Sequence, residues 1–469
     1  MPNQPQPPAW DQALIKRYNI SGPRYTSYPT APQLRSDFQQ AHFLAAMQRS
    51  NARATPLSLY FHIPFCDTVC YYCACNKIIT ADKKRAAPYL QTLFRELALQ
   101  AQHCDRTRPV EQLHWGGGTP TYISDTEKTQ LMAETRRYFN LSSDDSGDYS
   151  IEVHPGRMRV ETIALLRKLG FNRLSMGVQD FDPRVQQAVN RFNSVEQVKE
   201  LIQAARRESF HSISMDLIYG LPQQTLASMT TTLHQVIKLN PDRLSLFNYA
   251  HMPHLFKTQL KIDEQQLPAA EEKLQMLHSA IETLCQAGYV YIGMDHFAKP
   301  TDSLVAAQQQ GLLQRNFQGY STHGNCDLLA FGVSAISAID SVLMQNHKSI
   351  DDYSAAINSG SLALSRGLEL TSDDKLRKHI ITQLICHFRL NIPATESQFS
   401  IDFNDYFASE LALLGPMASD GLLRMDNLDI TVLDSGRLLI RAVCMVFDAY
   451  LKSSQTPVSN HPIRYSQVI

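Results

Sequence analysis

The sequence predicts an α/β protein built on an array of parallel βαβ units. Short apolar, β-prone runs recur along the chain, and amphipathic stretches with helical periodicity separate them. Regular alternation of this kind is typical of a parallel sheet covered by helices. The expected strands are 57–63, 110–115, 149–153, 173–178, 212–218, 243–248 and 289–294, and the expected helices include 87–101, 126–138, 160–169 and 194–206. In such an array the active site lies beyond the carboxyl ends of the strands.

Two segments flank this array. The N-terminal arm opens with a Pro-rich stretch, which we expect to be disordered, and continues with aromatic and basic residues mixed with turn formers. Near residue 363 the pattern changes to helix, helix, hairpin and helix, which predicts a mostly helical, winged-helix-like domain. The expected elements there are 373–388, 403–414, 422–425 with 430–433, and 436–451. We therefore expect three domains, 1–55, 56–362 and 363–469.

Composition excludes several classes of protein. The 469 residues include 44 basic and 45 acidic side chains, for a net charge of −1, so nothing indicates a nucleic-acid partner or a polybasic membrane surface. No apolar run is long enough to span a bilayer. The nine cysteines, an odd number in a long chain, argue against a disulfide framework. We expect a cytoplasmic protein and a monomer.

Four of the nine cysteines fall within ten residues. Cys66, Cys70 and Cys73 are spaced C-x3-C-x2-C just after the first expected strand, and Cys75 follows. Thiolates are soft ligands that suit zinc or iron–sulfur clusters. A structural zinc site needs four ligands, and no second cysteine pair at zinc-finger spacing follows. Three ligands on one loop suit a 4Fe–4S cluster with one open iron. Incidental cysteines are the weaker reading, because loop cysteines this dense rarely occur without a metal or a disulfide.

A run of three glycines follows the second expected strand. Gly116, Gly117 and Gly118 lack a Cβ and let another group approach the main chain closely. No Gly-Lys-Ser/Thr follows, which excludes a P-loop, and G-x-G-x-x-G fails because Thr121 stands at the third glycine position. Alone, the triplet is more often a tight turn than a binding motif.

Polar residues stand near the carboxyl ends of four consecutive expected strands. They are Glu152, Gln179, Asp216 and Asn248. Any one of them could be a helix cap, but polar residues at these positions face the site of a βα array more often than its core. Arg191, which we expect at the start of a helical stretch, suits a carboxylate ligand.

These motifs together resemble a known family. C-x3-C-x2-C after a strand resembles the signature of radical S-adenosylmethionine (SAM) enzymes. Cys75, within CYYCACNK, and the arm sequence RYTSYPT resemble the oxygen-independent coproporphyrinogen III oxidases, and the resemblance runs from Arg17 to the C-terminus. It implies a partial (β/α) barrel core and a 4Fe–4S cluster bound by Cys66, Cys70 and Cys73, with Cys75 not a ligand.

The resemblance also implies site residues. Two SAM molecules bind in the family, and the glycine triplet resembles the motif that holds the amino group of SAM. The positions that match the first SAM site are Tyr60, Gly117, Glu152 and Ile336, and those that match the second are Tyr72, Gly118, Thr119, Gln179, Arg191, Asp216 and Ala250. Phe317, Gln318 and Arg24 are candidates to contact the substrate, although core packing explains Phe317 equally well. Further candidates for carboxylates are Arg17, Lys299 and Arg315.

The implied reaction is the oxygen-independent decarboxylation of two propionates of coproporphyrinogen III to vinyl groups, by way of a 5′-deoxyadenosyl radical. It needs an electron donor for the cluster and an electron acceptor. The alternatives are a haem-trafficking or haem-degrading radical SAM paralogue, or a structural zinc or plain binding protein. His154, where close relatives have an acidic residue, and Ala74, where glycine is usual, depart from the family pattern.

Overall fold

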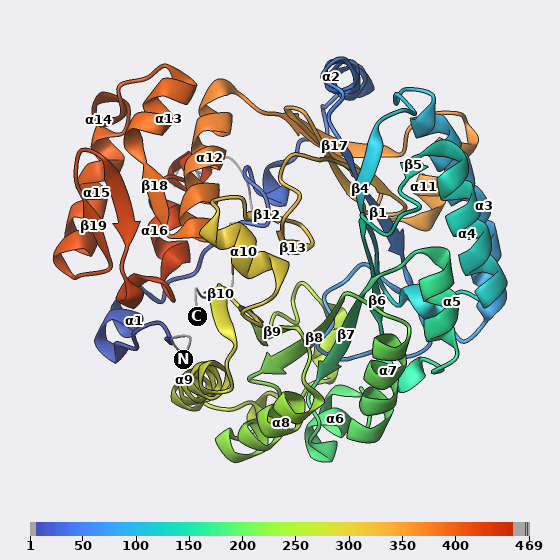
Figure 1. Cartoon of the computed structure of the whole chain (residues 1–469), viewed down its shortest axis with the longest axis horizontal. Helices are drawn as coiled ribbons and strands as arrows, with labels where there is room; N and C mark the ends of the chain where they lie inside the picture. Colours follow the sequence, from blue (N-terminus) through green and yellow to red (C-terminus); the bar gives the residue numbers. More distant parts are fainter. Residues whose placement is uncertain (1–5, 454–464, 466, 468–469) are drawn as a thin grey trace. The chain divides into compact units, whose positions relative to one another are not determined.

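The computed structural model describes residues 6–453, 465 and 467 (Figure 1). Residues 1–5 of the Pro-rich opening, which we expected to be disordered, lie outside the described residues. The chain divides into two compact units. The first comprises Met1–Gln33, Ile281–Gly324 and Leu370–Ile469, and the second comprises Leu34–Ala280 and Asn325–Glu369.

A parallel sheet forms the centre of the second unit. Its strands follow the order β9-β8-β7-β6-β4-β1-β14, and every neighbouring pair in this run is parallel. The strands are β1 (Leu57–Ile63), β4 (Pro109–Gly117), β6 (Asp148–Val153), β7 (Arg173–Gln179), β8 (Ser212–Tyr219), β9 (Arg243–Asn248) and β14 (Asp327–Phe331). Six of the seven expected strands are thereby confirmed, and so is the parallel α/β class.

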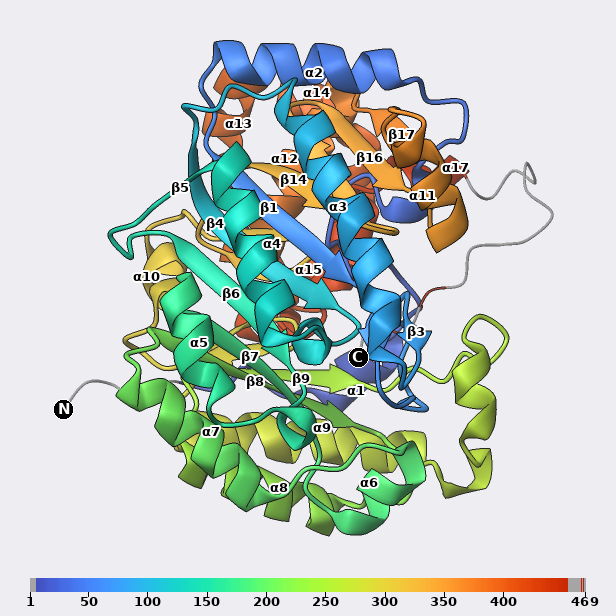
Figure 2. The same cartoon turned by 90° about the vertical axis from the view of Figure 1, so that its right-hand side faces the viewer.

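Helices run along the outer face of this sheet (Figures 1 and 2). They are α3 (Ala86–Ala101), α4 (Asp125–Tyr138), α5 (Thr162–Leu169), α6 (Pro183–Val189), α7 (Val195–Arg207) and α8 (Leu226–Leu239). Capping boxes fix the starts of α4 and α7, where Ser124 and Ser194 accept from the backbone of Glu127 and Gln197. The four helices predicted from periodicity are confirmed to within two residues at each end.

The two faces of the sheet differ in character. Along β6 and β7, fully buried apolar residues alternate with partly exposed, mostly polar ones. The apolar set packs against helices, whereas the polar set lies on the opposite face, where Ser58 of β1 donates to Gln112 Oε1 of β4 at 2.9 Å. This polar inner face carries Glu152 and Asp216, two of the predicted ligand contacts.

Beyond β14 the sheet becomes antiparallel. β15 (Ile336–Ile339), β16 (Val342–Asn346) and β17 (Leu364–Glu369) extend it, and none of the three was predicted. The carboxylate of Glu96 on α3 is buried where these strands meet the helices. It accepts from Gly332 N, Asn346 Nδ2 and Tyr353 OH, each at 2.7 Å. Helices α2 (Gln40–Ala52) and α11 (Ile350–Asn358) also belong to this unit.

The seventh expected strand, 289–294, lies in the first unit and does not run parallel to the others as predicted. β10 (Val290–Gly293) pairs antiparallel with β11 (His296–Ala298) instead of extending the parallel array. The reversal is local, because Gly293 and Met294 both adopt positive φ. Helix α9 (Ala270–Gln286) leads into β10, and α10 (Ser303–Gln309) and the hairpin β12 (Gln314–Asn316)–β13 (Gly319–Ser321) follow β11.

The C-terminal region is mostly helical with a small antiparallel sheet, β18-β20-β19, as expected. Its elements are α12 (Ser372–His387), β18 (Arg389–Asn391), α13 (Ile392–Phe399), α14 (Phe403–Tyr406), α15 (Ala408–Ser419), β19 (Leu423–Met425), β20 (Asp429–Val432), α16 (Ile440–Val446) and α17 (Ala449–Ser453). Two expected helices are interrupted, one at Phe407 and one at residues 447–448. Strand β18 and helix α13 were missed. Among the described residues, no helix is both long and apolar enough to cross a membrane.

The aromatic arm packs into the first unit. Tyr25 and Tyr28 are both 3% exposed. Tyr25 OH donates to Asp448 Oδ2 at 3.0 Å, and the backbone N–H of Ala449 donates to Tyr28 OH at 3.1 Å. The buried guanidinium of Arg441 donates to the carbonyls of the arm residues 22 and 23. The arm that follows α1 (Gln12–Tyr18) is therefore integral to this unit and not a loose loop on its surface.

Candidate functional site

The clustered cysteines lie on a loop that leaves β1 at Pro64. β2 (Phe65–Cys66) pairs in parallel with β3 (Ile78–Ile79), which closes the loop on itself. Cys70 is buried, Cys66 and Cys73 are partly buried, and Cys75 is exposed. All nine cysteines are free. The loop position predicted for the cysteines, directly after a strand, is confirmed.

The glycine triplet holds this cysteine loop in place. The backbone N–H groups of Gly118 and Thr119 donate to the carbonyls of Ile63 and Phe65, each at 2.9 Å. A Cβ on Gly118 would lie 2.7 Å from the carbonyl carbon of Pro64, so only glycine allows the two backbones to approach this closely. The triplet therefore accommodates the protein's own cysteine loop, in addition to any contact it makes with a ligand.

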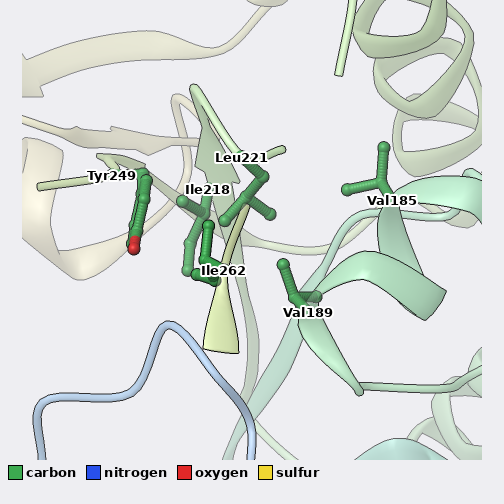
Figure 3. Packing of buried hydrophobic residues seen from close by; sticks show 6 residues of the cluster. All are labelled: Val185, Val189, Ile218, Leu221, Tyr249 and Ile262. Carbon is green, nitrogen blue, oxygen red and sulfur yellow. The ribbon is translucent and has the colours of Figure 1, made fainter. Parts of the chain in front are cut away.

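An apolar cluster supports the far side of the loop. It comprises Val185, Val189, Ile218, Leu221, Tyr249 and Ile262 (Figure 3). Tyr71 and Tyr72 of the cysteine loop pack against it. The backbone N–H of Tyr71 also donates to Val189 O at 3.0 Å, and Asn190 Nδ2 donates to Val69 O at 2.7 Å. Helix α6 and the ends of β8 and β9 thus position the segment that carries Cys70 and Cys73.

Two cations lie close to the thiols. Arg191 Nη1 donates to Cys70 Sγ at 3.6 Å, and Lys77 Nζ donates to Cys73 O at 2.8 Å. The hydrogen bond with Cys75, reinforced by the charge of Lys77, lowers the pKa of Cys73 to about 6 despite burial. Burial raises the pKa of Cys66 to about 11, although a hydrogen bond with Thr119 opposes the shift.

These pKa differences predict the order of thiol alkylation in cluster-free protein. At pH 7 Cys73 is mostly thiolate, whereas the pKa of Cys75 is raised by its hydrogen bond and proximity to Cys73. We expect iodoacetamide to modify Cys73 at least ten times faster than Cys66, and faster than the more exposed Cys75. Time-resolved peptide mass spectrometry measures the order. Modification that simply follows exposure, with Cys75 first, would contradict these electrostatics.

The donor set has the chemistry that an iron–sulfur cluster needs. Within the described part of the chain, no three Cys, His, Asp or Glu side chains are arranged to hold one metal ion. In an iron–sulfur cluster each thiolate binds a different iron, so the three sulfurs need not converge on one point. Three free thiols with Arg191 and Lys77 beside them suit thiolate ligands of a net negative cluster.

Three of the four residues predicted for the first SAM site, Tyr60, Gly117 and Glu152, lie around the carboxylate of Glu152. The Glu152 carboxylate on β6 contacts His114 Nε2 at 3.1 Å and accepts from the backbone N–H of Gly117 at 3.2 Å. The Tyr60 ring stacks on that of His114, with the ring centroids 5.9 Å apart. Burial raises the pKa of Glu152, but the interactions with His114 and Gly117 outweigh it and hold the pKa below its usual value.

His114 was missed from the sequence, although a signal for it existed. It occupies the same face of β4 as Gln112 and Gly116, and it is in register with Tyr60 of β1 and Ser150 of β6. Strand alternation therefore placed it among the inward residues. The remaining predicted residue of this set, Ile336, begins β15, on the other side of β14 from β1.

Several residues predicted for the second SAM site also lie together on the polar face. Arg191 donates to Gly177 O from Nε at 3.0 Å and also reaches Cys70, which joins β7 to the cysteine loop. Asp216 accepts from Ser175 Oγ at 3.3 Å. Burial raises the pKa of Asp216 to about 6; the charge of Glu152 adds to the shift, while Ser245, Ser175 and Arg191 oppose it. Gln179 ends β7 with a φ of 72°, a value that is strained for a residue other than glycine.

Two predicted ligand contacts carry a buried side-chain oxygen that the described residues leave without a hydrogen bond. Gln179 Oε1 and Asn248 Oδ1 are buried and have no hydrogen-bond partner among the described residues. Leaving a buried polar atom unpaired costs free energy, and such atoms are typical of sites that a ligand completes. They stand at the last positions of β7 and β9, the two strands that flank β8 in the sheet.

One local expectation was wrong. Asn190 and Arg191 stand at the end of α6, not at the start of a helix: Asn190 is the left-handed C-cap, with φ of 53°. Asparagine tolerates this conformation, which turns the chain so that Arg191 points back to the sheet.

Tyr72 and Ala250 both accept, through their carbonyls, from Gln259 Nε2 at 3.0 and 3.3 Å. Phe317, Gln318 and Arg24 belong to the first unit.

The two departures from the family pattern have different consequences. His154 is 8% exposed, and burial together with the charges of Arg191 and Arg157 lowers its pKa to about 3. It is therefore neutral at pH 7 and does not neutralise Arg191 as an acidic residue would. Ala74 is exposed, so its methyl group is accommodated without packing cost.

Comparisons with known proteins agree with this geometry. A model of the radical SAM superfamily matches residues 60–236. The oxygen-independent coproporphyrinogen III oxidase of Pseudomonas aeruginosa is 52% identical over 444 residues, which cover 95% of this chain and 96% of the relative. The Escherichia coli protein of the same name is 49% identical over 94% of this chain and 96% of the relative. A solved structure of coproporphyrinogen III oxidase from Escherichia coli, described as a radical SAM enzyme, covers 95% of this chain with a TM-score of 0.91 and 47% identity.

Proposed function

Because the chain belongs to the oxygen-independent coproporphyrinogen III oxidase family of radical SAM enzymes, we propose that it converts coproporphyrinogen III to protoporphyrinogen IX without oxygen. The observation that carries the proposal is the loop bearing Cys66, Cys70 and Cys73 beside the polar inner face of the parallel sheet. The reaction belongs to porphyrin and haem biosynthesis.

Each turnover converts one propionate side chain to a vinyl group. When held by Cys66, Cys70 and Cys73, a reduced 4Fe–4S cluster together with SAM would supply the one-electron chemistry that removes a hydrogen atom from the propionate carbon next to the pyrrole. The propionate then loses carbon dioxide and one electron, which an external acceptor takes. For each vinyl group, one electron enters from the donor and one leaves to the acceptor. The product has two new vinyl groups, so its formation consumes two SAM molecules, takes two electrons from the donor and gives two to the acceptor.

The roles of the residues follow from their chemistry. Cys66, Cys70 and Cys73 hold the cluster, and Arg191 lies beside Cys70, where it can also pair with a carboxylate of SAM. Glu152, whose pKa lies below its usual value, is ionised and suits a ribose diol. Asp216 faces the same space and favours a cationic group.

We further propose two SAM sites in each chain. The first comprises Tyr60, Gly117, Glu152 and Ile336, and the second comprises Tyr72, Gly118, Thr119, Gln179, Arg191, Asp216 and Ala250. The unpaired oxygen of Gln179 and its strained backbone support a ligand at the second site. Equilibrium dialysis with labelled SAM, using protein with a full cluster, distinguishes two molecules per chain from one.

Anaerobic turnover tests the proposed reaction. Reconstituted protein, a reductant, SAM, an electron acceptor and coproporphyrinogen III should yield protoporphyrinogen IX, with two methionines released for each product molecule. Liquid chromatography after oxidation to the fluorescent porphyrins measures the conversion. Methionine release with no vinyl product, or SAM-dependent binding of haem instead, would overturn the assignment in favour of a haem-handling paralogue.

A further inference from the structure

The hairpin β12–β13 of the first unit presents one arginine and one tyrosine as a cross-strand pair. Arg315 is directly opposite Tyr320 in the register, so both side chains project from the same face of the hairpin. The guanidinium carbon of Arg315 lies 4.7 Å from the centroid of the Tyr320 ring. Tyr320 is itself fixed, because its hydroxyl donates to Ile385 O at 2.9 Å. The arginine is therefore held against a rigid aromatic surface.

The hydrogen-bond donors of this hairpin are not satisfied by the protein. Arg315 Nε and Nη1 are buried, and neither has a hydrogen-bond partner in the described part of the chain. Gln318 Nε2, in the turn of the same hairpin, is also buried and also has no hydrogen-bond partner among the described residues. Burying a charged donor without an acceptor is among the most costly arrangements in a protein. Three unsatisfied donors within residues 315–318 indicate a missing acceptor with negative charge.

The charges around Arg315 point to the same kind of ligand. Arg24 forms an ion pair with Asp295, and Arg441 donates to neutral backbone carbonyls. Burial, together with the positive charges of Arg24 and Arg315, lowers the pKa of Arg441 to about 10. Asp295 is the carboxylate that offsets them there. The positive charges of Arg24, Arg315 and Arg441 therefore favour an anionic ligand.

We propose that Arg315 and Gln318 bind a propionate carboxylate of the tetrapyrrole substrate, and specifically one that remains in the product. This inference rests on the proposed function. A carboxylate supplies both the charge and the acceptor atoms that these donors lack. A reacting propionate becomes neutral carbon dioxide, so a strong contact to its carboxylate would stabilise the substrate more than the transition state and slow the reaction. A retained propionate carries no such penalty, and its contact orients the macrocycle.

Equilibrium binding of coproporphyrin III, the fluorescent oxidised form of the substrate, tests the site in protein with its cluster. We expect Arg315→Gln to weaken binding roughly 10- to 100-fold and Gln318→Leu to weaken it less. The matched control is Arg389→Gln, because Arg389 is an exposed arginine of the same unit that pairs with Asp429. The tetramethyl ester of coproporphyrin III has no carboxylate, so wild type and Arg315→Gln should bind it equally.

A second measurement separates ligand binding from a structural role. Without porphyrin, Arg315→Gln should have an unchanged or higher Tm than the wild type, because it removes two buried donors that lack an acceptor. In turnover, KM should rise for Arg315→Gln while kcat changes little, and Arg315→Lys should restore part of the affinity. Wild-type affinity for the tetra-acid in Arg315→Gln would overturn the inference and leave the proposed function intact. A wild-type protein that makes no vinyl product would instead overturn the proposed function.

Discussion

Replacing Cys70 by serine is expected to remove the iron–sulfur cluster and all reductive cleavage of SAM, whereas Cys75→Ser should keep both. Cys70 is buried, accepts a hydrogen bond from Arg191 and lies on a segment fixed by Asn190 and the apolar cluster behind it. A serine hydroxyl is a hard, weakly acidic group that does not replace a thiolate at iron. Iron and sulfide content after anaerobic reconstitution, together with methionine released per chain, measures the effect.

Cys75 is the matched control because it lies on the same loop but is exposed. Cys75→Ser should retain at least half of the wild-type iron content, and only the pKa of Cys73 should change, since the hydrogen bond between these two side chains lowers it. If Cys75→Ser loses as much iron as Cys70→Ser, the assignment of three cysteine ligands is wrong.

Asp216→Asn is expected to weaken SAM binding while making the protein more stable. An ionised carboxylate beside a cationic ligand contributes about 1.5–3 kcal/mol, so its loss should raise the Kd for SAM roughly 10- to 100-fold. In the folded protein the pKa of Asp216 is raised from 3.8 to about 6. The folded state therefore binds the proton more tightly than the unfolded state, and the free energy of unfolding falls as the pH rises through this window.

The variant removes the contribution of this position to the pH dependence of stability. Asparagine stays neutral, so at pH 8 Asp216→Asn should exceed wild type in the free energy of unfolding by up to about 3 kcal/mol, and the gain should vanish near pH 4. Denaturant unfolding of cluster-free protein at both pH values measures it. The matched control is Asp180→Asn, because Asp180 is a buried carboxylate with a raised pKa that accepts hydrogen bonds from Thr232 and Gln224 and is not itself a predicted ligand contact. Tighter SAM binding by Asp216→Asn would contradict the role given to this carboxylate.

The periodicity of apolar residues in the sequence was sufficient to predict the parallel core of the fold. Strands β6 and β7 show the alternation of apolar and polar residues that a sheet covered on one face requires, and helices α4 and α7 begin with capping boxes. The sequence was less informative where pairing depends on a tight turn or on distant partners. The reversal of β10 follows from the positive φ of Gly293 and Met294, and β14 becomes a core strand only by pairing with β1, some 270 positions away in the chain.

The candidate site also combines features that the sequence predicted with features that only the structure shows. Cysteine spacing alone marked the cluster loop, because that chemistry is local in sequence. The close approach of Gly118 to Pro64 and the stacking of Tyr60 on His114 depend on neighbouring strands, so the sequence did not show them. The unpaired donors of Arg315 are also invisible in sequence, since an arginine reveals whether it has an acceptor only once its surroundings are known.

Methionine release from SAM is the most direct test of the central claim, that three cysteines hold a cluster able to cleave SAM. Anaerobically purified and reconstituted protein should contain close to four irons and four sulfides per chain. On reduction with dithionite it should release methionine and 5′-deoxyadenosine from SAM in equal amounts. Protein that contains one zinc ion per chain instead, or a reduced cluster that releases no methionine, would contradict the claim.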